Sequence, residues 1–500
     1  MPKLDVTLDR WLPDLLPFAM LKGGLVTCKN IMPLEEKFAN MPRPIAYSTN
    51  AVTGTPLSSV EYYADNGIFY TFIGTTTKLY RMETNKSLTD VTRTSGDYTT
   101  SGNRWYFAKY GNWIIATNFN DEVQVLKGMT AANFEPLYTT ETIKAKYIVQ
   151  NHGHLLLFYV IRNGVTYPNG VIISAKDTIN DVVKSIATGA DFVNLEESPT
   201  QITGANVFEF ASAAYESNIA ITHRNSISVC WYAGGQYIFN FDYNRYLEIG
   251  ALEGSFVMVN GIAYFFDEKT FYRWDGINKP EDIGLGVRNT ILNFLDIASY
   301  YRITAASHPR YGLAVWSIVK TSGSGNPDYI LILNTRNNKF SLIELTQYCV
   351  FSMHRNAWTI DAMGDFFPKI NEIPYPVNSN YWQDTSAIFG CIGTDLKVNV
   401  FQGVAMNWKI ETGDISTPDL EIIRSKRTHP IIANNISPVT VSIGSRMEES
   451  DAVVYTSTSV ASNGYADIRA FGRYMRIALE GGAHGGLHSI DVKGDIIGRK

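Results

Sequence analysis

One phrase recurs along this chain: a Gly or small residue, a short apolar strand, a turn, and a second strand. Its copies begin at residues 67, 111, 153, 218, 261, 312 and 387, and three of the six intervals are 42 to 44 residues long. A four-stranded propeller blade takes roughly 40–45 residues. The repeat therefore predicts an all-β protein built as a β-propeller of six or seven blades.

The composition fits such a fold. Aromatic residues make up 13% of the chain, with 29 Tyr, and there are 39 Gly. Aromatic side chains suit pleated, half-buried surfaces, and Gly supplies the turns between strands. The predicted organisation is an irregular, Pro-rich N-terminal arm over 1–60 and a propeller over 61–405. Insertions interrupt it near 161–217 and 320–386, and longer alternating strands over 406–500 predict a β-sandwich-like domain.

Three short segments depart from the strand pattern. In the first insertion, Asp177 precedes apolar residues at helical spacing, which predicts a helix within 175–189. A second helix is expected over 287–300, with Ile291 and Leu295 on its apolar face. The segment from Trp11 to Met20 is amphipathic and is expected to dock on the body or on a neighbour.

Charge and cysteine content exclude several classes of protein. The net charge of −5 is spread along the chain, which argues against a basic nucleic-acid clamp. The four cysteines lack any CxxC or zinc spacing and are expected to be buried, inert thiols: Cys28, Cys230, Cys349 and Cys391. No apolar run approaches the roughly 18–20 residues that span a bilayer, and acidic residues interrupt the first 16 positions. We therefore expect synthesis in the cytoplasm, without a secretory signal or membrane anchor.

Catalytic and metal-binding motifs are not found in the sequence. There is no G-x-S-x-G nucleophile motif. His152 and His154 could share one side of a strand, but no third metal ligand lies near them in sequence. His484 and His488 lie in a Gly-rich loop without a partnering carboxylate. Adjacent carboxylates point to opposite faces of a strand and are poor acid–base pairs, which applies to Asp121–Glu122, Glu196–Glu197 and Glu448–Glu449.

Three further patterns also do not indicate a functional site. Arg424, Lys426 and Arg427 form the densest basic cluster, and a solvated face explains it. Gly284 and Gly286 lack the third glycine of a phosphate loop. Trp274-Asp275 is the only Trp-Asp pair, without the preceding Gly-His of a WD40 repeat. We therefore predict that the chain has no catalytic residue, no cofactor site and no metal site, and that it is not an enzyme.

An ordered set of motifs resembles one known family. They are GGL…KNIMP at 23–33, KLYRM at 78–82, DVTR…DYTTSGNRWYFAKYGNWIIATN at 90–118, IGLGV at 283–287, AVWSI at 314–318, LNTRNNKFSLIEL at 333–345 and FGRYMRI at 471–477. Together they resemble the tail nozzle proteins of short-tailed bacteriophages, also called tubular tail protein B or tail hub, and their prophage relatives. Phe340 stands where the family is expected to have Trp, a change of one core side chain.

The resemblance implies a structural virion protein. It implies a homohexameric ring that lies below the portal and the head-to-tail adaptor, prolongs the genome ejection channel, and carries tail fibres or a needle. DNA would pass through the lumen of that ring without sequence-specific binding, and the protein would reside in the tail of the virion. A lumen that is not basic suits this role, because Lys and Arg contacts to phosphates would retain DNA.

Two other functions remain open from the residues. The first is a carbohydrate-binding or glycan-cleaving propeller for receptor recognition, in which the 29 Tyr and 9 Trp line sugar platforms. The repeated aspartate turns of sialidase-like propellers are not found, which counts against it. The second is a cellular scaffold propeller that binds peptides.

Overall fold

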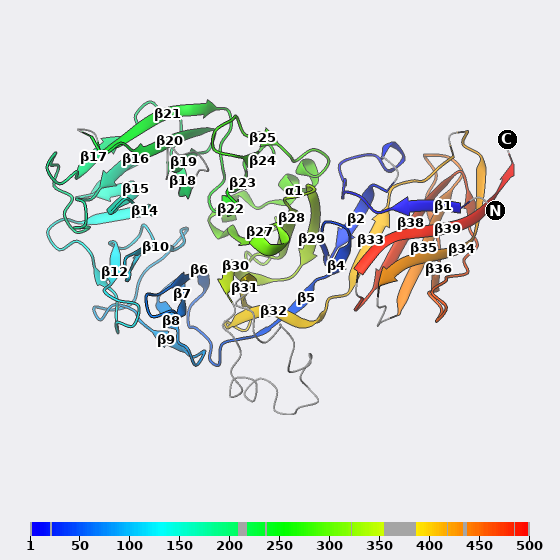
Figure 1. Ribbon diagram of the computed structural model, residues 1–500, viewed down its shortest axis with the longest axis horizontal. Coiled ribbons are helices and arrows are strands. Elements are labelled where there is room, and N and C mark those ends of the chain that lie inside the picture. The colour runs from blue at the N-terminus through cyan, green and yellow to red at the C-terminus, as the bar shows by residue number, and fades with distance from the viewer. Residues whose placement is uncertain are drawn as a thin grey trace.

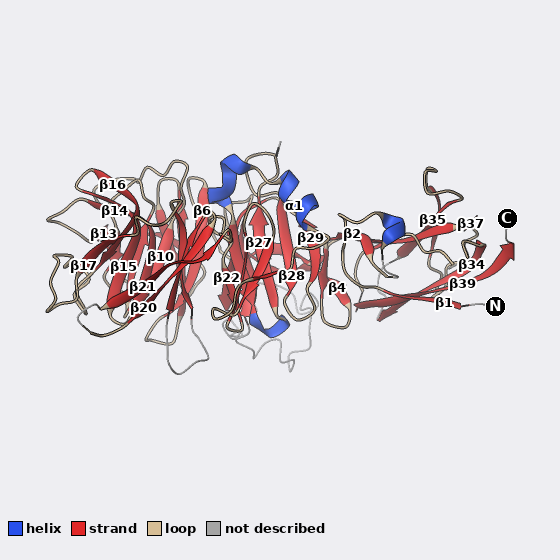
Figure 2. Ribbon diagram, turned by 90° about the horizontal axis from the view of Figure 1, so that it is seen from above, coloured by secondary structure: helices blue, strands red, loops and turns tan. Residues whose placement is uncertain are grey.

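The protein forms a β-propeller with a β-sandwich beside it, in an elongated arrangement (Figures 1 and 2). The computed structural model describes residues 3–20, 23–208, 218–235, 238–321, 323–354, 387–417, 419–433, 438–484 and 486–498. Nearly all elements within these ranges are strands. The predicted fold class, an all-β propeller with a C-terminal sandwich-like domain, is confirmed.

The first three blades are antiparallel sheets whose four strands follow one another in sequence. Blade one contains β6 (Pro56–Tyr63), β7 (Phe69–Thr75), β8 (Leu79–Met82) and β9 (Leu88–Asp90). Blade two contains β10 (Tyr106–Tyr110), β11 (Trp113–Thr117), β12 (Gln124–Leu126) and β13 (Glu135–Pro136). Blade three contains β14 (Ile143–Asn151), β15 (His154–Arg162), β16 (Val165–Ile173) and β17 (Asp191–Asn194).

The next three blades repeat the plan. Blade four contains β18 (Ile202–Phe208), β19 (Asn218–His223), β20 (Ser226–Tyr232) and β21 (Phe239–Leu247). Blade five contains β22 (Val257–Val259), β23 (Ile262–Phe266), β24 (Phe271–Trp274) and β25 (Glu281–Asp282). Blade six contains β26 (Thr304–His308), β27 (Leu313–Ile318), β28 (Tyr329–Asn334) and β29 (Lys339–Glu344).

The recurrent glycine lies at the hairpin between the first two strands of a blade. Asn260 and Gly261 join β22 to β23, and both have positive φ, 51° and 78°. A two-residue turn with positive φ at both positions matches the right-handed twist of the flanking strands, and Asn-Gly adopts it readily. This backbone requirement explains why the repeat is visible in the sequence.

Blade seven closes the propeller with a strand from the N-terminal region. Its strands are β30 (Gln347–His354), β31 (Ala387–Gly393), β32 (Val398–Ala405) and β5 (Pro42–Ala46), in that order. β5 pairs antiparallel with β32, with Val400 opposite Ile45. The described chain therefore has seven blades, which settles the predicted six or seven, and the propeller takes in residues from within 1–60.

The sandwich is built from both ends of the chain. One sheet contains β3 (Ile31–Pro33), β4 (Phe38–Asn40), β39 (Gly486–Gly498), β34 (Ile422–Ala433) and β37 (Phe471–Gly472), and β1 (Lys3–Thr7) pairs with β39. The other contains β2 (Leu25–Lys29), β33 (Trp408–Thr412), β38 (Tyr474–Gly481), β35 (Val439–Arg446) and β36 (Val454–Ser459). The prediction of an irregular arm over 1–60 was wrong, because β1, β2, β4 and β5 each pair with a strand more than 300 residues away.

The sandwich and the propeller share one sheet and one hydrophobic core. β2 runs parallel to β29, so blade six continues into the sandwich as a nine-stranded sheet. The same cluster of buried side chains includes Trp316 and Phe340 of blade six and Trp408 and Ile490 of the sandwich. Phe340, the predicted departure from the family, is buried in this core, 5.4 Å from the ring of Phe271. The two parts are therefore joined rigidly.

The helices differ from the predictions. The described helices are η1 (Pro17–Ala19), α1 (Arg288–Phe294), η2 (Ile297–Arg302) and η3 (Pro309–Tyr311). The helix expected over 287–300 divides into α1 and η2, because Leu295 takes an extended conformation with ψ of 135°. The helix expected within 175–189 does not form. That stretch is a turn-rich loop in which Val183 and Ile186 are exposed, so only part of its apolar face is buried.

The two predicted insertions lengthen connections within blades. In the first, predicted near 161–217, only the loop of residues 174–190 between β16 and β17 is inserted, because β16, β17 and β18 are regular blade strands. Residues 209–217 lie outside the described residues. In the second, β28, β29 and β30 are regular blade strands, so 323–354 is not an insertion. The Pro-rich stretch 366–378 lies outside the described residues. In the parts of the chain that the structure describes, no helix has the length and apolar character to cross a membrane.

Candidate functional site

Three of the four histidines singled out in the sequence, His152, His154 and His484, pack against aromatic rings. His152 stacks on Tyr232 at 4.4 Å, and the buried His154 places its Nδ1 2.8 Å from the carbonyl oxygen of Ser174. His484 is buried against Trp408, and burial lowers its pKa to about 4. His488 lies on β39 and is half-buried. No group of three or more His, Cys, Asp or Glu that could hold a metal occurs among the described residues.

The adjacent carboxylates each have their own neighbours and do not form acid–base pairs. Asp121 accepts hydrogen bonds from Arg93 at 2.9 Å and from Asn118 at 3.0 Å within a turn. Glu448 pairs with Arg473 at 2.7 Å, and Glu449 accepts a hydrogen bond from the hydroxyl of Tyr474 at 2.9 Å. Asn194 donates to Glu196 at 3.2 Å, and Glu197 is exposed.

Acidic side chains balance the basic cluster. Arg424 pairs with Asp495 at 3.1 Å, Lys426 pairs with the same carboxylate, and Arg427 pairs with Asp467 at 2.5 Å. Two carboxylates thus face three cations, which leaves little excess charge for a phosphate.

The glycines before α1 do not form an anion site. Asp14, from the N-terminal segment, accepts hydrogen bonds from the backbone N–H groups of Asn289 and Thr290 at 2.8 and 2.7 Å. These are N–H groups of the first turn of a helix, which would otherwise be available to an anion. The expected docking of the segment from Trp11 to Met20 on the body is confirmed, and it blocks this helix end.

The cysteines and the single Trp-Asp pair have structural roles. All four cysteines are buried and free, and burial raises the pKa of each thiol, that of Cys349 to about 12. They are therefore protonated and unreactive at neutral pH. Trp274 is buried in blade five and donates its ring N–H to the carbonyl oxygen of Asn278 at 2.8 Å.

A charged cluster that sequence reasoning missed lies among the first strands of the blades. Lys146 of β14 pairs with Glu253, in the connection that leads into β22, at 2.7 Å, and both side chains are nearly buried. The hydroxyl of Tyr106, on β10, donates to the same carboxylate at 3.2 Å. Arg104 lies over the ring of Tyr106 at 4.5 Å. These residues come from blades two, three and five, and their sequence spacing gives no indication of the contact.

This cluster holds the blades together rather than supplying paired catalytic groups. It contains one carboxylate, and Lys146 compensates its charge. Hydrolysis of a glycoside by two carboxylates needs a second one within roughly 5–10 Å. Burial raises the pKa of Tyr106 well above its usual value, so its hydroxyl is a hydrogen-bond donor at physiological pH. The cluster can fix the relative positions of three blades.

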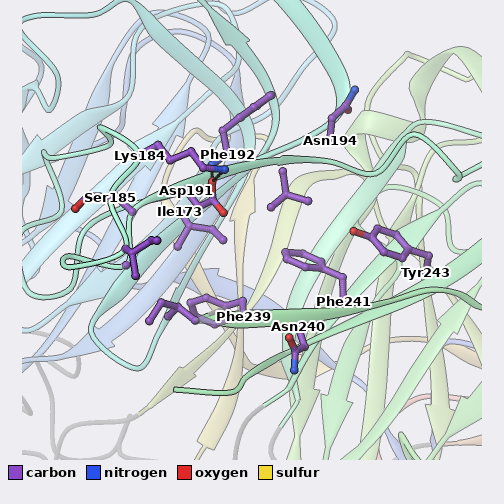
Figure 3. A pocket seen from close by; sticks show the side chains of 15 residues that line it. Ile173, Lys184, Ser185, Asp191, Phe192, Asn194, Phe239, Asn240, Phe241 and Tyr243 are labelled. Carbon is purple, nitrogen blue, oxygen red and sulfur yellow. Dashed lines mark hydrogen bonds and ion pairs between the residues drawn. The ribbon is translucent and has the colours of Figure 1, made fainter. Parts of the chain in front are cut away.

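The candidate binding site is a groove of about 530 Å³ between the outer strands of blades three and four (Figure 3). β21 of blade four contributes Phe239, Phe241 and Tyr243, which alternate along the strand and so point to one face. β17 and the loop before it contribute the other wall, with Lys184, Asp191, Phe192 and Asn194. Sequence reasoning missed this site, because the two walls are about 50 residues apart and the loop was predicted to be a helix.

Comparisons with known proteins identify no family for this chain. No family model matches it, and no curated protein matches it. Among solved structures, virginiamycin B lyase from Staphylococcus aureus aligns with 62% of this chain and 92% of its own, at 9% identity and a TM-score of 0.39. BamB from Moraxella catarrhalis aligns with 80% and 98%, at 10% identity and a TM-score of 0.37.

An α-L-arabinanase from Penicillium chrysogenum aligns with 73% of this chain and 98% of its own, at 8% identity and a TM-score of 0.30. Likenesses of this size do not inform the function. The class of protein is defined by the sheet topology: a seven-bladed β-propeller within the described residues, attached to a sandwich made from both chain ends.

Proposed function

We propose that this protein is a structural subunit of a phage tail nozzle and has no catalytic role. The observation that carries the proposal is the ordered set of motifs that resembles the nozzle family, since it spans both parts of the fold. KNIMP lies in β2 and β3 of the sandwich, and DYTTSGNRWYFAKYGNWIIATN forms β10 and β11 of the propeller. FGRYMRI lies in β37 and β38 of the sandwich.

The rigid connection between propeller and sandwich supports this role. Asn30 of the sandwich donates its backbone N–H to the carbonyl oxygen of Leu342 at 2.9 Å and accepts from the N–H of Glu344 at 2.8 Å. Lys29 pairs with Glu344 at 2.6 Å at the same place. A ring that guides DNA under pressure needs subunits whose two parts keep a fixed relation, and a shared sheet with a shared core provides it.

In this function the subunits form a homohexameric ring below the portal and adaptor, with fibres or a needle attached. Such a ring places one surface of each subunit against a different surface of the next. The genome passes through the lumen of the ring and not through the propeller. A net charge of −5 is compatible with a lumen that does not bind DNA.

Electron microscopy of the purified protein over a range of concentrations tests this proposal. We expect sixfold rings with a hole wide enough for duplex DNA. Mass spectrometry of purified particles from the phage or prophage that encodes the chain is the complementary test. The proposal is wrong if the protein is missing from those particles.

A second candidate function, glycan recognition by the propeller, is favoured by the groove between blades three and four. Aromatic rings and paired polar side chains face each other there, as binding sites for small polar ligands require. A glycan array probed with the purified protein tests this function. Saturable binding to defined glycans supports it, and uniform absence of binding removes it. The two functions are compatible, because the groove occupies only the outer edge of two blades.

A further inference from the structure

The wall of the groove formed by β21 is an aromatic platform. The rings of Phe241 and Tyr243 lie 6.2 Å apart with an interplanar angle of 20°. Exposure rises along the strand, from 5% for Phe239 to 38% for Tyr243. In Figure 3 the labelled rings of Phe239, Phe241 and Tyr243 follow β21 along one side of the groove. Two nearly parallel rings at successive positions make this wall apolar along the strand, so a ligand that extends along β21 contacts both of them.

The opposite wall mixes apolar side chains, such as Ile186 and Phe192, with polar ones, and it has no net charge. Lys184 Nζ lies 2.7 Å from Asp191 Oδ1, so the one cation and the one anion that line the groove compensate each other. Asn194 adds an amide on β17. An ammonium, a carboxylate and an amide together provide donors and acceptors within one groove. A charged ligand would find no uncompensated partner here, and its desolvation would be unfavourable.

We propose that this groove binds a neutral oligosaccharide whose consecutive sugar rings lie along β21, against Phe241 and Tyr243. The proposal rests on the second candidate function and names the class of ligand for it. A sugar ring has an apolar face of C–H groups and an equatorial rim of hydroxyls. The C–H face fits the aromatic wall, and the hydroxyls fit the Lys184–Asp191 pair and Asn194.

The size of the groove favours a short chain over a single sugar. Its volume of about 530 Å³ lies within the roughly 300–1,000 Å³ of sites that hold drug-sized ligands. One hexose would leave part of the platform uncovered. Affinity should therefore increase with chain length until both rings are covered.

A glycan array that contains neutral and acidic chains of one to six sugars is the first experiment. We expect binding to neutral chains, with a tri- or tetrasaccharide bound more tightly than the monosaccharide of the same series. Titration calorimetry with the best neutral chain then measures the variants. Tyr243→Ala and Phe241→Ala should each weaken binding about five- to tenfold, since each removes one aromatic face. Tyr243→Phe keeps the ring and should retain most of the affinity.

Tyr311→Ala is the matched control, because Tyr311 of η3 is 42% exposed and lies on blade six, away from the groove. Its affinity should equal that of the unmodified protein. Neutral-chain binding that survives Tyr243→Ala overturns the groove as the site but leaves glycan recognition in place. A preference for acidic chains overturns the assigned class. Absence of binding to every glycan overturns both the inference and the second candidate function.

Discussion

The propeller and the sandwich differ in how far apart in sequence their neighbouring strands lie. In blades one to six, each strand pairs with the next one along the chain. In the sandwich, β39 pairs with β1, β34 and β4, so it joins the last residues to the first. Blade seven is intermediate, since only β5 comes from afar. Local pairings appear as a repeat in the sequence, whereas distant ones leave no periodic trace.

The same difference predicts where stability depends on the N-terminal region. Loop closure must occur before distant strands can gain from pairing, so long-range pairings form at a high entropic cost. Six blades can form from local segments. Closure of blade seven and completion of the sandwich both need residues 3–46.

Deleting residues 1–46 should have the largest effect. The deletion removes β1 to β5, so β32 loses one of its two partner strands and the sandwich loses strands from both sheets. We expect loss of the cooperative unfolding transition in thermal circular dichroism. A shorter deletion of residues 1–8 removes β1 alone and should leave blade seven closed. Limited proteolysis compares the two variants. Equal cleavage of blade seven in both would contradict the expectation that β5 is needed to close this blade.

Trp316→Ala tests whether the propeller and sandwich share one core. Trp316 is fully buried and donates its ring N–H to the carbonyl oxygen of Ser255 at 2.6 Å. Removing a buried Trp side chain costs about 3–5 kcal/mol. Hydrogen exchange should rise in β33 and β38 of the sandwich as well as in blade six.

Trp105→Ala is the matched control for that substitution. Trp105 is equally buried and donates to the carbonyl oxygen of Thr75 at 2.7 Å, but its core lies between blades one and two. The free energy of unfolding should fall by a similar amount, with sandwich exchange unchanged. If hydrogen exchange in the sandwich strands is the same in Trp316→Ala and Trp105→Ala, the propeller and the sandwich do not share one core.

Glu61 should make the contact between blades seven and one dependent on pH. Its carboxylate, on β6, accepts a hydrogen bond from Nδ1 of His354, on β30, at 2.9 Å. Burial raises the pKa of Glu61 from 4.5 to about 7. Between pH 4.5 and about 7, Glu61 is protonated in the folded protein but deprotonated in the unfolded chain. The stabilising contribution is therefore complete below pH 4.5 and is lost as the pH rises through about 7.

The expected loss is about 1–3 kcal/mol, since one unit of pKa difference corresponds to about 1.4 kcal/mol. Urea unfolding of the unmodified protein and of Glu61→Gln between pH 4.5 and 8 measures it. The Gln variant stays neutral, so its stability should depend less on pH. Parallel pH profiles of the two proteins would exclude this role for Glu61.

Asp14→Ala should have the smallest effect and tests a contact between the N-terminal segment and the propeller. Loss of the acceptor for the first N–H groups of α1 costs about 0.5–2 kcal/mol, as for other helix caps. Asp14→Asn keeps an oxygen acceptor and should recover most of that loss. Hydrogen exchange of residues 288–294 reports the effect directly. Exchange in α1 that is the same in all three proteins would show that the cap contributes nothing.

The sequence was informative where local physics is sufficient. The Gly-centred hairpins predicted the blades, because a positive φ at positions such as Gly261 restricts the residue that can stand there. The burial of the four cysteines followed from their apolar neighbours. The helix predicted within 175–189 failed, because apolar spacing alone does not show whether Val183 and Ile186 meet a surface that covers them.

The candidate sites could not be derived in this way. Lys146 and Glu253 are 107 positions apart, and only the circular order of the blades brings them to 2.7 Å. Asp14 meets α1 only because the N-terminal segment crosses from the sandwich to the propeller. The groove needs two outer strands from different blades and a loop whose conformation depends on both.

By itself, the amino-acid sequence determined most of the blade strands, their hairpin turns and the blade length at three of the six intervals, since these depend on neighbours within about 45 positions. The tertiary structure decided how the propeller closes, which strands make the sandwich, and which side chains line the groove. Those features depend on pairings between the chain ends and between separate blades. Their stability comes from burying surfaces that no local segment can bury alone.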